Sequence, residues 1–284
     1  MPELPEVETI RRDLQRLILH KKIVQVQIRP KARVFPLPKK FIQLLINTEI
    51  LSLNRRGKLL FGQLANGQYL LVHLKMTGQL IYRRGDQRAS GGHEEKDKGE
   101  TEKYNRIRIV FADGSELLFN DLRRFGYWRL VSEIEKERVL AEYGWEPLGS
   151  DFSFVRFSAL SSGRSTTIKS LLLDQKLIAG LGNIYAAEVC FSAGILPTRS
   201  AKSLSAVEQK KLWQNIRRIM RLAVKKRGTT FANYRDARGR KGNFVPLLCV
   251  YGRRGQTCLR CRRAQIQEKK ISGRTTAFCP FCQK

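Results

Sequence analysis

Cysteines near the end of the chain occur in a pattern that could bind a metal ion. Four of the six form two C-x-x-C pairs separated by 17 residues: Cys258, Cys261, Cys279 and Cys282. Two tight turns at this spacing can present four thiolates tetrahedrally to Zn²⁺. Because four cysteine ligands leave no coordination position open, we expect one structural Zn²⁺ and no organic cofactor. The lone Cys190 and Cys249 suit a reducing compartment better than a disulfide framework.

The beginning of the chain carries a second group of residues that could do chemistry. Pro2 is small enough for the initiator Met1 to be removed, which would leave a secondary amine. Such an amine, with a pKa near ~8, can condense with an aldehydic carbon to an iminium ion, an electron sink that permits elimination. Of Glu3 and Glu6, one could be a general acid while the other stabilises positive charge. Acidic residues also suit the first turn of a helix, and the spacing alone favours that simpler interpretation.

Periodicity predicts the elements that position these residues. From Val7 to Ile18, apolar residues recur at helical spacing, which predicts an amphipathic helix. From about Ile23 to Val131, short β-rich segments alternate with turn signals, a pattern typical of a sandwich or barrel. The expected strands are Ile23–Ile28, Lys58–Leu64, Tyr69–Leu74, Ile107–Phe111 and Glu116–Phe119. The polar stretch from Arg83 to Lys103 has too little apolar content to pack, so we expect a flexible loop there.

The second half of the chain has helical periodicity. The expected helices are Ile168–Leu177, Ile184–Phe191 and Leu204–Val224. A Gly- and Arg-rich connection follows from Arg227 to Phe244, and the tail from Leu247 is predicted to be a small metal-stapled hairpin. Several cations lie within or beside the hairpin, namely Arg260, Arg262, Arg263, Lys269, Lys270 and Arg274. It is therefore suited to contact phosphates or a groove, with a solvated basic surface as the alternative.

The charge of the whole chain points to a polyanionic partner. Lys and Arg number 54 against 25 Asp and Glu, which gives a formal net charge of +29. This excess is far above what solubility requires, although a generally basic protein or one that sits on anionic lipid would also show it. No run of about 18 apolar residues occurs and the N-terminus lacks a secretory pattern, so we expect a cytoplasmic protein.

With these features in hand, the sequence resembles the formamidopyrimidine-DNA glycosylase/endonuclease VIII family over nearly its whole length. The opening Pro2-Glu3-Leu4-Pro5-Glu6-Val7-Glu8 matches the formamidopyrimidine branch. Four further matching motifs follow in order: Arg55-Arg56-Gly57-Lys58, His73-Leu74-Lys75-Met76-Thr77-Gly78, Asp121-Leu122-Arg123-Arg124-Phe125-Gly126, and Asp174-Gln175-Lys176 through Gly180-Leu181-Gly182-Asn183-Ile184-Tyr185. The spacing alone favours a simple helix start at Pro2, whereas the resemblance favours a catalytic role for this residue.

The resemblance implies a role for each residue of the proposed catalytic set. Pro2 matches the Schiff-base nucleophile that attacks C1′ of the damaged nucleotide, and Glu3 the acid that assists opening of the deoxyribose. Glu6 would support both electrostatically. Lys58 matches the lysine that contacts phosphate and donates a proton in β-elimination, and Arg274 the arginine linked to δ-elimination.

The resemblance also implies a set of DNA contacts. Met76, Arg123 and Phe125 match side chains that enter the helix where the damaged base leaves, which offsets the cost of flipping it. Asn183 would grip phosphates in a helix-two-turns-helix motif. Four further residues are expected to contact DNA: Tyr104, Arg106, Arg164 and Lys169.

Tyr104 is a departure from the family, which has a histidine at this position, and the nearby Arg106 would supply the missing charge. The stretch from Gly228 to Phe244 matches the family's loop over the flipped purine, a candidate lid.

The prediction as a whole is a multidomain α+β protein. We expect an N-terminal β-sandwich flanked by helices (1–132), a helix-two-turns-helix domain (150–226), a lesion-recognition loop (227–246) and a C-terminal zinc-finger β-hairpin (247–284). The expected activity is excision of oxidised purines, namely 8-oxoguanine and formamidopyrimidines, from duplex DNA, with strand nicking by β,δ-elimination. We expect the protein to act as a monomer associated with the nucleoid. The alternatives are an endonuclease VIII-like enzyme for oxidised pyrimidines and a non-catalytic zinc-ribbon DNA-binding protein.

Overall fold

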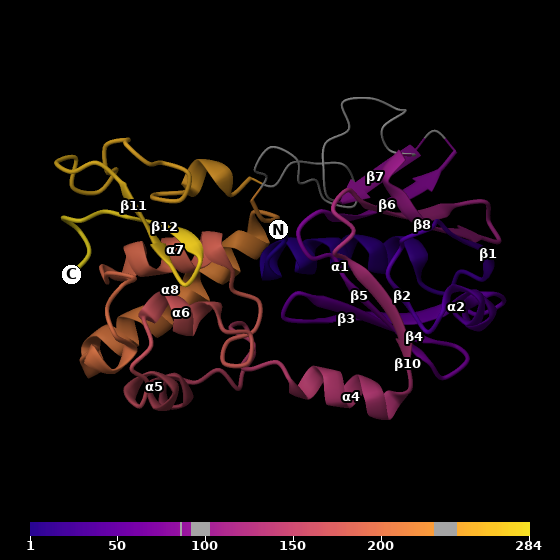
Figure 1. Cartoon of the computed structure of the whole chain (residues 1–284), viewed down its shortest axis with the longest axis horizontal. Helices are drawn as coiled ribbons and strands as arrows, with labels where there is room; N and C mark the ends of the chain where they lie inside the picture. Colours follow the sequence, from indigo (N-terminus) through magenta and orange to yellow (C-terminus); the bar gives the residue numbers. More distant parts are fainter. Residues whose placement is uncertain (86, 92–102, 230–242) are drawn as a thin grey trace. The chain divides into compact units, whose positions relative to one another are not determined.

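The computed structural model describes residues 1–85, 87–91, 103–229 and 243–284 (Figure 1). The chain forms two compact units, each made of two segments. The first unit comprises Met1–Ala141 with Lys226–Val245, and the second comprises Glu142–Lys225 with Pro246–Lys284. The C-terminal hairpin therefore belongs to the same unit as the helices, while the domain boundaries expected from the sequence remain predictions.

The first unit begins with the predicted amphipathic helix, α1 (Leu4–Ile18). Its start is set by a capping box, in which the side chains of Glu3 and Glu6 each accept a hydrogen bond from the other's backbone N–H. Pro5 lies in the first turn, where its missing N–H costs nothing. The helix buries its apolar stripe in the core of this unit.

Two five-stranded sheets make up most of the first unit. The first has the order β1-β8-β9-β6-β7, with bounds Ile23–Ile28, Asn105–Phe111, Glu116–Asp121, Gly78–Arg84 and Gln87–Gly91. The second has the order β2-β10-β5-β4-β3, with bounds Val34–Phe35, Tyr127–Val131, Tyr69–His73, Leu59–Leu64 and Ile50–Arg56. All pairings are antiparallel except that of β2 with β10. Two further helices, α2 (Pro38–Leu45) and α4 (Glu133–Ala141), also belong to this unit.

Side chains on β8 alternate between the core and the outer face of the first sheet. Ile107, Ile109 and Phe111 are buried in the core that both sheets share with α1. Arg106 and Arg108 lie on the opposite, half-buried face. This alternation produces the predicted sandwich, and it also gathers arginines on one surface.

The segment from Arg83 to Lys103 differs in part from the sequence-based expectation of a loop. Strand β6 continues through Arg84, and Gln87–Gly91 forms β7, which pairs with it in antiparallel register. The loop prediction is wrong for these residues because backbone hydrogen bonds to a neighbouring strand do not require apolar side chains. The rest of that prediction concerns residues 92–102, which lie outside the described part of the chain.

The second unit is built from helices and one hairpin. The helices are α5 (Phe154–Ser162), α6 (Ile168–Leu173), α7 (Asn183–Ala193) and α8 (Ala206–Lys225), with a 3₁₀ turn at Ala201–Ser203. A second 3₁₀ turn, Val245–Leu247, belongs to this unit from Pro246 onward. Ser153 and Thr167 cap α5 and α6 by accepting backbone hydrogen bonds. The hairpin pairs β11 (Gln267–Ile271) with β12 (Arg274–Phe278). Within the described residues, no helix is both long and apolar enough to cross a membrane.

Candidate active site and nucleic-acid interface

The start of the chain lies beside two buried carboxylates. Pro2 is half-buried and directly precedes Glu3, and Glu6 follows in the first turn of α1; each carboxylate is only 2 % exposed. The Glu3 N–H donates to Glu6 Oε2 over 2.8 Å, so Glu6 holds the backbone next to Pro2. The other oxygen of Glu6 accepts hydrogen bonds from the N–H (2.7 Å) and hydroxyl (3.1 Å) of Thr229. The predicted catalytic residues Pro2, Glu3 and Glu6 are thus brought together.

The segment that meets Glu6 requires a glycine. Gly228 has φ +81°, and a Cβ atom at this position would lie 2.5 Å from Glu6 Oε1. Any side chain would therefore both strain the backbone and displace the carboxylate. Arg227 anchors the same segment by donating to the buried Asp13 of α1. The remainder of the expected lid, residues 230–242, lies outside the described part of the chain.

Glu8 supports the turn that carries Lys58, a role that the sequence reasoning missed. It accepts hydrogen bonds from Arg11 and Arg12, one helical turn away, and from Arg55 Nε at 3.2 Å. Arg55 in turn donates to the Gly57 carbonyl over 3.0 Å. Burial raises the pKa of Glu8, but the bonds from Arg11 and Arg12 and the charge of Arg55 outweigh it and lower the pKa to about 2.

This carboxylate therefore stays ionised next to the turn. Lys58 itself is 6 % exposed. The spacing of Glu8 from the two helix arginines was the available signal, since residues three and four apart share a helix face.

Met76, Arg123 and Phe125 form a second cluster in the first unit. Arg123 Nη1 lies 3.1 Å from Met76 Sδ, and its guanidinium sits 4.8 Å from the centre of the Phe125 ring. Met76 is 42 % exposed and Phe125 43 %, although both are apolar. Exposed apolar side chains stacked on a cation suit insertion between bases. The structure brings this predicted set together, and its contact with DNA remains a prediction.

Asp121 braces this insertion cluster of Met76, Arg123 and Phe125. Its two carboxylate oxygens accept hydrogen bonds from the Thr77 hydroxyl and, over 2.7 Å, from the Gly126 N–H. Thr77 Oγ1 also accepts the Arg123 N–H at 3.0 Å, so a single carboxylate links both segments. The sequence contained Asp121 and Thr77 within matched motifs, yet nothing local indicated that the two side chains meet across β6 and β9.

Tyr104 and Arg106 lie on or just before β8. Tyr104 is half-buried, with the Lys103 ammonium 5.9 Å from its ring centre. Arg106 Nε donates to the Asp121 carbonyl over 3.0 Å, so it adjoins the segment that leads to the insertion cluster. Burial, then the positive charges of Arg124 and Arg29, lower the pKa of Arg106. A phosphate oxygen beside Arg106 would relieve that repulsion, which supports its predicted role.

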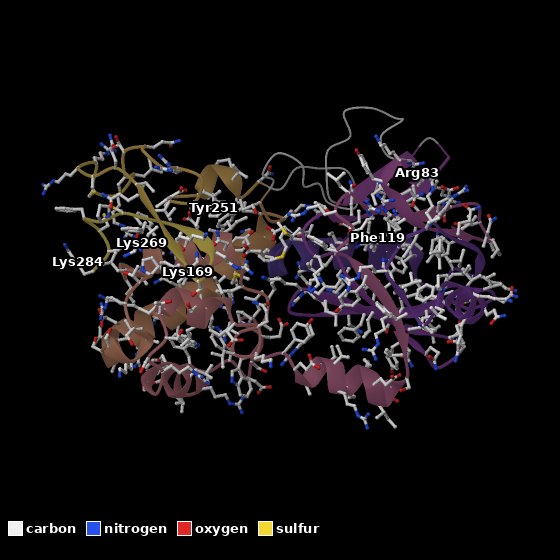
Figure 2. All side chains as sticks on the ribbon, in the orientation of Figure 1. Arg83, Phe119, Lys169, Tyr251, Lys269 and Lys284 are labelled. Carbon is white, nitrogen blue, oxygen red and sulfur yellow. The ribbon has the colours of Figure 1, made fainter. Side chains whose placement is uncertain are left out.

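In the second unit, Asn183 begins α7 next to the hairpin. Its Nδ2 donates to the Thr275 carbonyl over 2.9 Å, directly beside the exposed Arg274 of β12. Lys169, which Figure 2 labels, is fully buried. Its Nζ donates to the Asn183 carbonyl over 3.2 Å. Lys169 therefore holds the backbone of Asn183 through this hydrogen bond, while a direct phosphate contact by Lys169 remains a prediction. Arg164 is exposed, two residues after the end of α5.

Two side chains that the sequence reasoning gave no role hold this site in place. Gln175 bridges the turns between α6 and α7, accepting from the Gly180 N–H and donating to the Leu173 and Leu181 carbonyls. Glu188 is buried on α7 and accepts three backbone hydrogen bonds of 2.9 Å from consecutive residues: Cys249, Val250 and Tyr251. Burial raises the pKa of Glu188 despite these bonds. Its partners lie some 60 residues away, so sequence spacing gave no signal.

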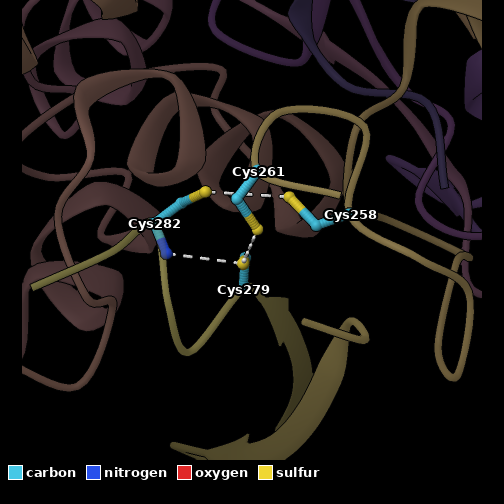
Figure 3. Close-up of side chains that lie close together, drawn as sticks. All are labelled: Cys258, Cys261, Cys279 and Cys282. Atoms are coloured by element: carbon cyan, nitrogen blue, oxygen red, sulfur yellow. Dashed lines mark hydrogen bonds between the residues drawn. The ribbon is translucent and has the colours of Figure 1, made fainter. Parts of the chain in front are cut away.

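The sulfur atoms of the four paired cysteines converge, as a tetrahedrally coordinated metal ion would need (Figure 3). All four Sγ atoms lie within 4.8 Å of one another, and the Cys258–Cys282 and Cys261–Cys279 sulfur distances are both 3.8 Å. Tetrahedral thiolates at Zn–S distances of 2.3 Å would lie about 3.8 Å apart. Gln283 fixes the second knuckle by accepting from the Cys279 N–H and donating to the Ile195 carbonyl. The arrangement fits a structural metal site.

Comparisons with known proteins agree with this architecture. Models of the formamidopyrimidine-DNA glycosylase N-terminal domain and H2TH domain match residues 1–128 and 143–234. The formamidopyrimidine-DNA glycosylase of Heliobacterium modesticaldum is 42 % identical over 290 residues, covering 100 % of both chains. That of Listeria monocytogenes is 39 % identical over 287 residues, again covering 100 % of both chains.

Solved structures give the same result. Wild-type Lactococcus lactis Fpg in complex with DNA containing N7-benzyl-Fapy-dG superposes with a TM-score of 0.87 at 33 % identity, covering 100 % of both chains. The MutM (Fpg) protein of Thermus thermophilus has a TM-score of 0.84 at 37 % identity, covering 99 % of this chain and 98 % of that one. The predicted α+β fold and the family resemblance are thereby confirmed. The chain belongs to the formamidopyrimidine-DNA glycosylase family, whose members are DNA glycosylases of base excision repair.

Proposed function

We propose that this protein removes oxidised purines from duplex DNA and nicks the strand by β,δ-elimination through a Schiff base on Pro2. The observation that carries the proposal is that Pro2 directly precedes two buried carboxylates, Glu3 and Glu6, which are linked by a hydrogen bond from the Glu3 N–H at the start of α1. Buried carboxyls close together can divide into one proton donor and one fixed negative charge. The proposed reaction passes through a cationic iminium intermediate, so it needs both a proton donor and a fixed negative charge.

The proposed chemistry begins when the Pro2 nitrogen, freed by removal of Met1, attacks C1′ of the damaged nucleotide. The bond from C1′ to the base breaks, the base takes the electron pair and a proton, and protonation of the ring oxygen by Glu3 opens the deoxyribose. The resulting iminium ion acidifies C2′, so loss of that proton expels the 3′ phosphate, and a second elimination expels the 5′ phosphate. Glu6 orients Glu3 and balances the cation, and Lys58 donates protons to departing groups.

Recognition of the lesion is assigned to residues of both units. Met76, Arg123 and Phe125 would fill the space that a flipped base leaves, and Asn183 with Arg274 would hold phosphates. In support, related Lactococcus lactis Fpg structures are complexes with DNA containing an abasic site or a Fapy-type lesion. We assign duplex DNA with oxidised bases as the partner, bound by a monomer in the cytoplasm.

The cysteine cluster is assigned to one Zn²⁺ held by Cys258, Cys261, Cys279 and Cys282. When bound, the ion supplies folding energy to the hairpin and no catalytic step. The cluster adjoins a small apolar core that includes Ala187 and Phe191 of α7. A folded hairpin would keep Arg274 next to Asn183, where both could meet the same strand of DNA.

The decisive experiment is borohydride trapping on duplex DNA with an abasic site. We expect a covalent adduct that peptide mass spectrometry locates on Pro2 at the mature terminus, and we expect none from Pro2→Gly or from protein that retains Met1. Absence of an adduct from a correctly processed wild-type chain would refute the iminium mechanism and favour a non-catalytic zinc-ribbon protein. Excision of thymine glycol in preference to 8-oxoguanine would instead favour the endonuclease VIII-like alternative.

A further inference from the structure

The outer face of the first sheet contains a cavity of about 250 Å³ that is surrounded by arginines. Its walls include four guanidinium groups and one carboxylate: Arg29, Arg83, Arg106, Arg108 and Glu116. We call it the arginine pocket. It lies wholly within the first unit and contains none of the proposed catalytic residues.

The register of four neighbouring strands explains why these side chains gather. Arg106 and Arg108 are two residues apart on β8 and so share a face, and the Arg29 N–H donates to the Arg106 carbonyl over 2.9 Å. On the other side, Arg83 of β6 pairs in register with Glu116 of β9 (Figure 2 labels Arg83). The cavity therefore rests on a rigid sheet.

The charged side chains that the structure describes around the arginine pocket are mainly cationic. Four are arginines and one is Glu116, which forms an ion pair with Arg108. Arg83, Arg106 and Arg108 are half-buried, so water screens their repulsion less than it would on an open surface. Guanidinium groups that converge on a cavity match the geometry of phosphate oxygens, which accept two parallel N–H bonds from one arginine.

Two features separate this pocket from an ordinary basic surface. The charged groups line a concave space instead of spreading into solvent. In addition, Asn105 is one of the lining residues, and its amide oxygen is buried and has no hydrogen-bond partner among the described residues. An unpartnered buried polar atom is rare in folded proteins and marks this residue out from an ordinary surface amide.

Arg106 connects the pocket to the segment that carries the insertion cluster. It lines the cavity and also donates to the Asp121 carbonyl, two residues before Arg123. The pocket therefore adjoins a segment that is predicted to contact DNA, which favours a phosphate of DNA over a free phosphate compound.

We propose that the arginine pocket is an additional phosphate-binding subsite, which holds the DNA backbone beyond the nucleotides that flank the lesion. The inference rests on the proposed function for the identity of the ligand. A free di- or polyphosphate offers the same chemistry and is distinguished in the experiment.

The test measures equilibrium binding to uncleavable abasic-analogue duplexes of about 12 and about 40 base pairs, over a range of salt concentrations. The pocket variant is Arg83→Gln/Arg108→Gln. The matched control is Lys39→Gln/Lys40→Gln, which removes the same charge from the exposed face of α2 in the same unit. The charge-retaining Arg83→Lys/Arg108→Lys serves as a rescue, and thermal unfolding checks that each variant folds.

For the long duplex, we expect the pocket variant to bind about 3- to 10-fold more weakly than the wild type. Its salt slope, the slope of the logarithm of the binding constant against the logarithm of the salt concentration, should fall in magnitude by about 1 for each phosphate that it no longer neutralises. The Lys pair should restore most of the affinity, and the α2 control should keep the wild-type slope. On the short duplex all four proteins should bind alike. Equal long-duplex slopes for the pocket variant and the α2 control would overturn the assignment to DNA. If inorganic pyrophosphate then stabilises only proteins with an intact pocket, the ligand is a free phosphate compound.

The single exposed variant Arg29→Gln provides a second test if the double variant unfolds, with a smaller loss of affinity expected in the same direction. Borohydride trapping on the short duplex separates this proposal from the proposed function. Failure of trapping in the wild type would refute the chemistry at Pro2, whereas the binding assay would still report on the pocket. Normal trapping together with an unchanged salt slope would refute the pocket alone.

Discussion

Glu6 in the first unit and Glu188 in the second are buried carboxylates, and each holds a distant segment of the chain by accepting backbone hydrogen bonds. Glu6 accepts backbone hydrogen bonds from Glu3 at 2.8 Å and Thr229 at 2.7 Å. Glu188 accepts three such bonds from residues 249–251, each 2.9 Å long. In both cases a carboxylate on a helix fixes a segment that is far away in the sequence, because backbone donors satisfy a charge that would otherwise be costly to bury.

The difference lies in what each carboxylate holds. Glu6 orients the residues next to Pro2, where bonds would be made and broken, whereas Glu188 holds the segment that leads into the cysteine hairpin. Disturbing the first region should therefore slow the reaction without weakening DNA binding. Disturbing the second should weaken DNA binding without slowing the chemistry of bound DNA.

The largest effect is expected from Glu3→Gln in the first region. Loss of the proton donor should reduce base excision by about 10²- to 10⁴-fold in single-turnover kinetics. Cleavage of a preformed abasic site should fall much less, because no bond from C1′ to a base remains to be broken there. Equal losses on the two substrates would mean that Glu3 acts in a step that both share, such as ring opening or elimination, and not specifically in base removal.

A smaller effect, on binding, is expected from Cys279→Ser in the second region. Removing one of four ligands should release the metal and unfold the hairpin, with a loss of about 100-fold in DNA affinity. Fluorescence anisotropy measures the affinity, and metal analysis measures the zinc content. The matched control is Cys249→Ser, which changes a cysteine outside the cluster and should retain both. Full affinity in metal-free Cys279→Ser would contradict a role for the hairpin in binding.

Glu188→Gln tests the comparison directly. Glutamine keeps one oxygen for Val250 and Tyr251 but directs an NH₂ group at the N–H of Cys249, which should cost about 1–3 kcal/mol locally. We expect DNA affinity to fall about 10-fold while the single-turnover rate of bound DNA stays constant. Faster amide exchange confined to the hairpin and residues 249–251 would locate the effect. Glu142→Gln, an exposed change in the same unit, should behave as wild type.

The parts of the structure that the sequence predicted are those with a clean local pattern. Strand β1 spans the expected Ile23–Ile28, and α8 begins two residues after and ends one residue after the expected Leu204–Val224. The cysteine spacing predicted a cluster whose four sulfur atoms do converge. By contrast, α2, α4 and α5 were missed, because helices of eight or nine residues offer only two turns of periodicity.

The side chains that hold the sites together could not be predicted, because their partners are distant in sequence. Asp121 meets Thr77 across two strands, and Glu188 meets a segment about 60 residues away. Either carboxylate would pass as an ordinary surface charge in the sequence. The family motifs contained Asp121 and Gln175, but a motif match gives no partner and no direction. Only the fold supplies the contacts that explain why an acid or an amide stands there.

The smallest expected effect is a difference in pH dependence between the two units. Burial, then the charges of Lys75 and Lys58, lower the pKa of His73 to about 3, and its Nδ1 accepts the Lys75 N–H over 2.9 Å. Because an unfolded histidine binds a proton near pH 6.5 and folded His73 does not, stability of the first unit should fall as pH drops below about 6.5, by at most about 1.4 kcal/mol per pH unit. The second unit contains no histidine in its sequence.

In the second unit the sign should be reversed, since the pKa of Glu188 is raised above its usual value of 4.5. The folded state then binds a proton more readily than the unfolded state, and this contribution favours folding as pH falls toward 4.5. Amide exchange between pH 6.5 and 5 should therefore accelerate, after correction for intrinsic rates, in the first unit only. His73→Asn keeps an acceptor for Lys75 but cannot titrate, so it should abolish the trend, whereas His20→Asn at an exposed position with φ 58° should preserve it. Parallel trends in the two units would show that neither group governs stability in this range.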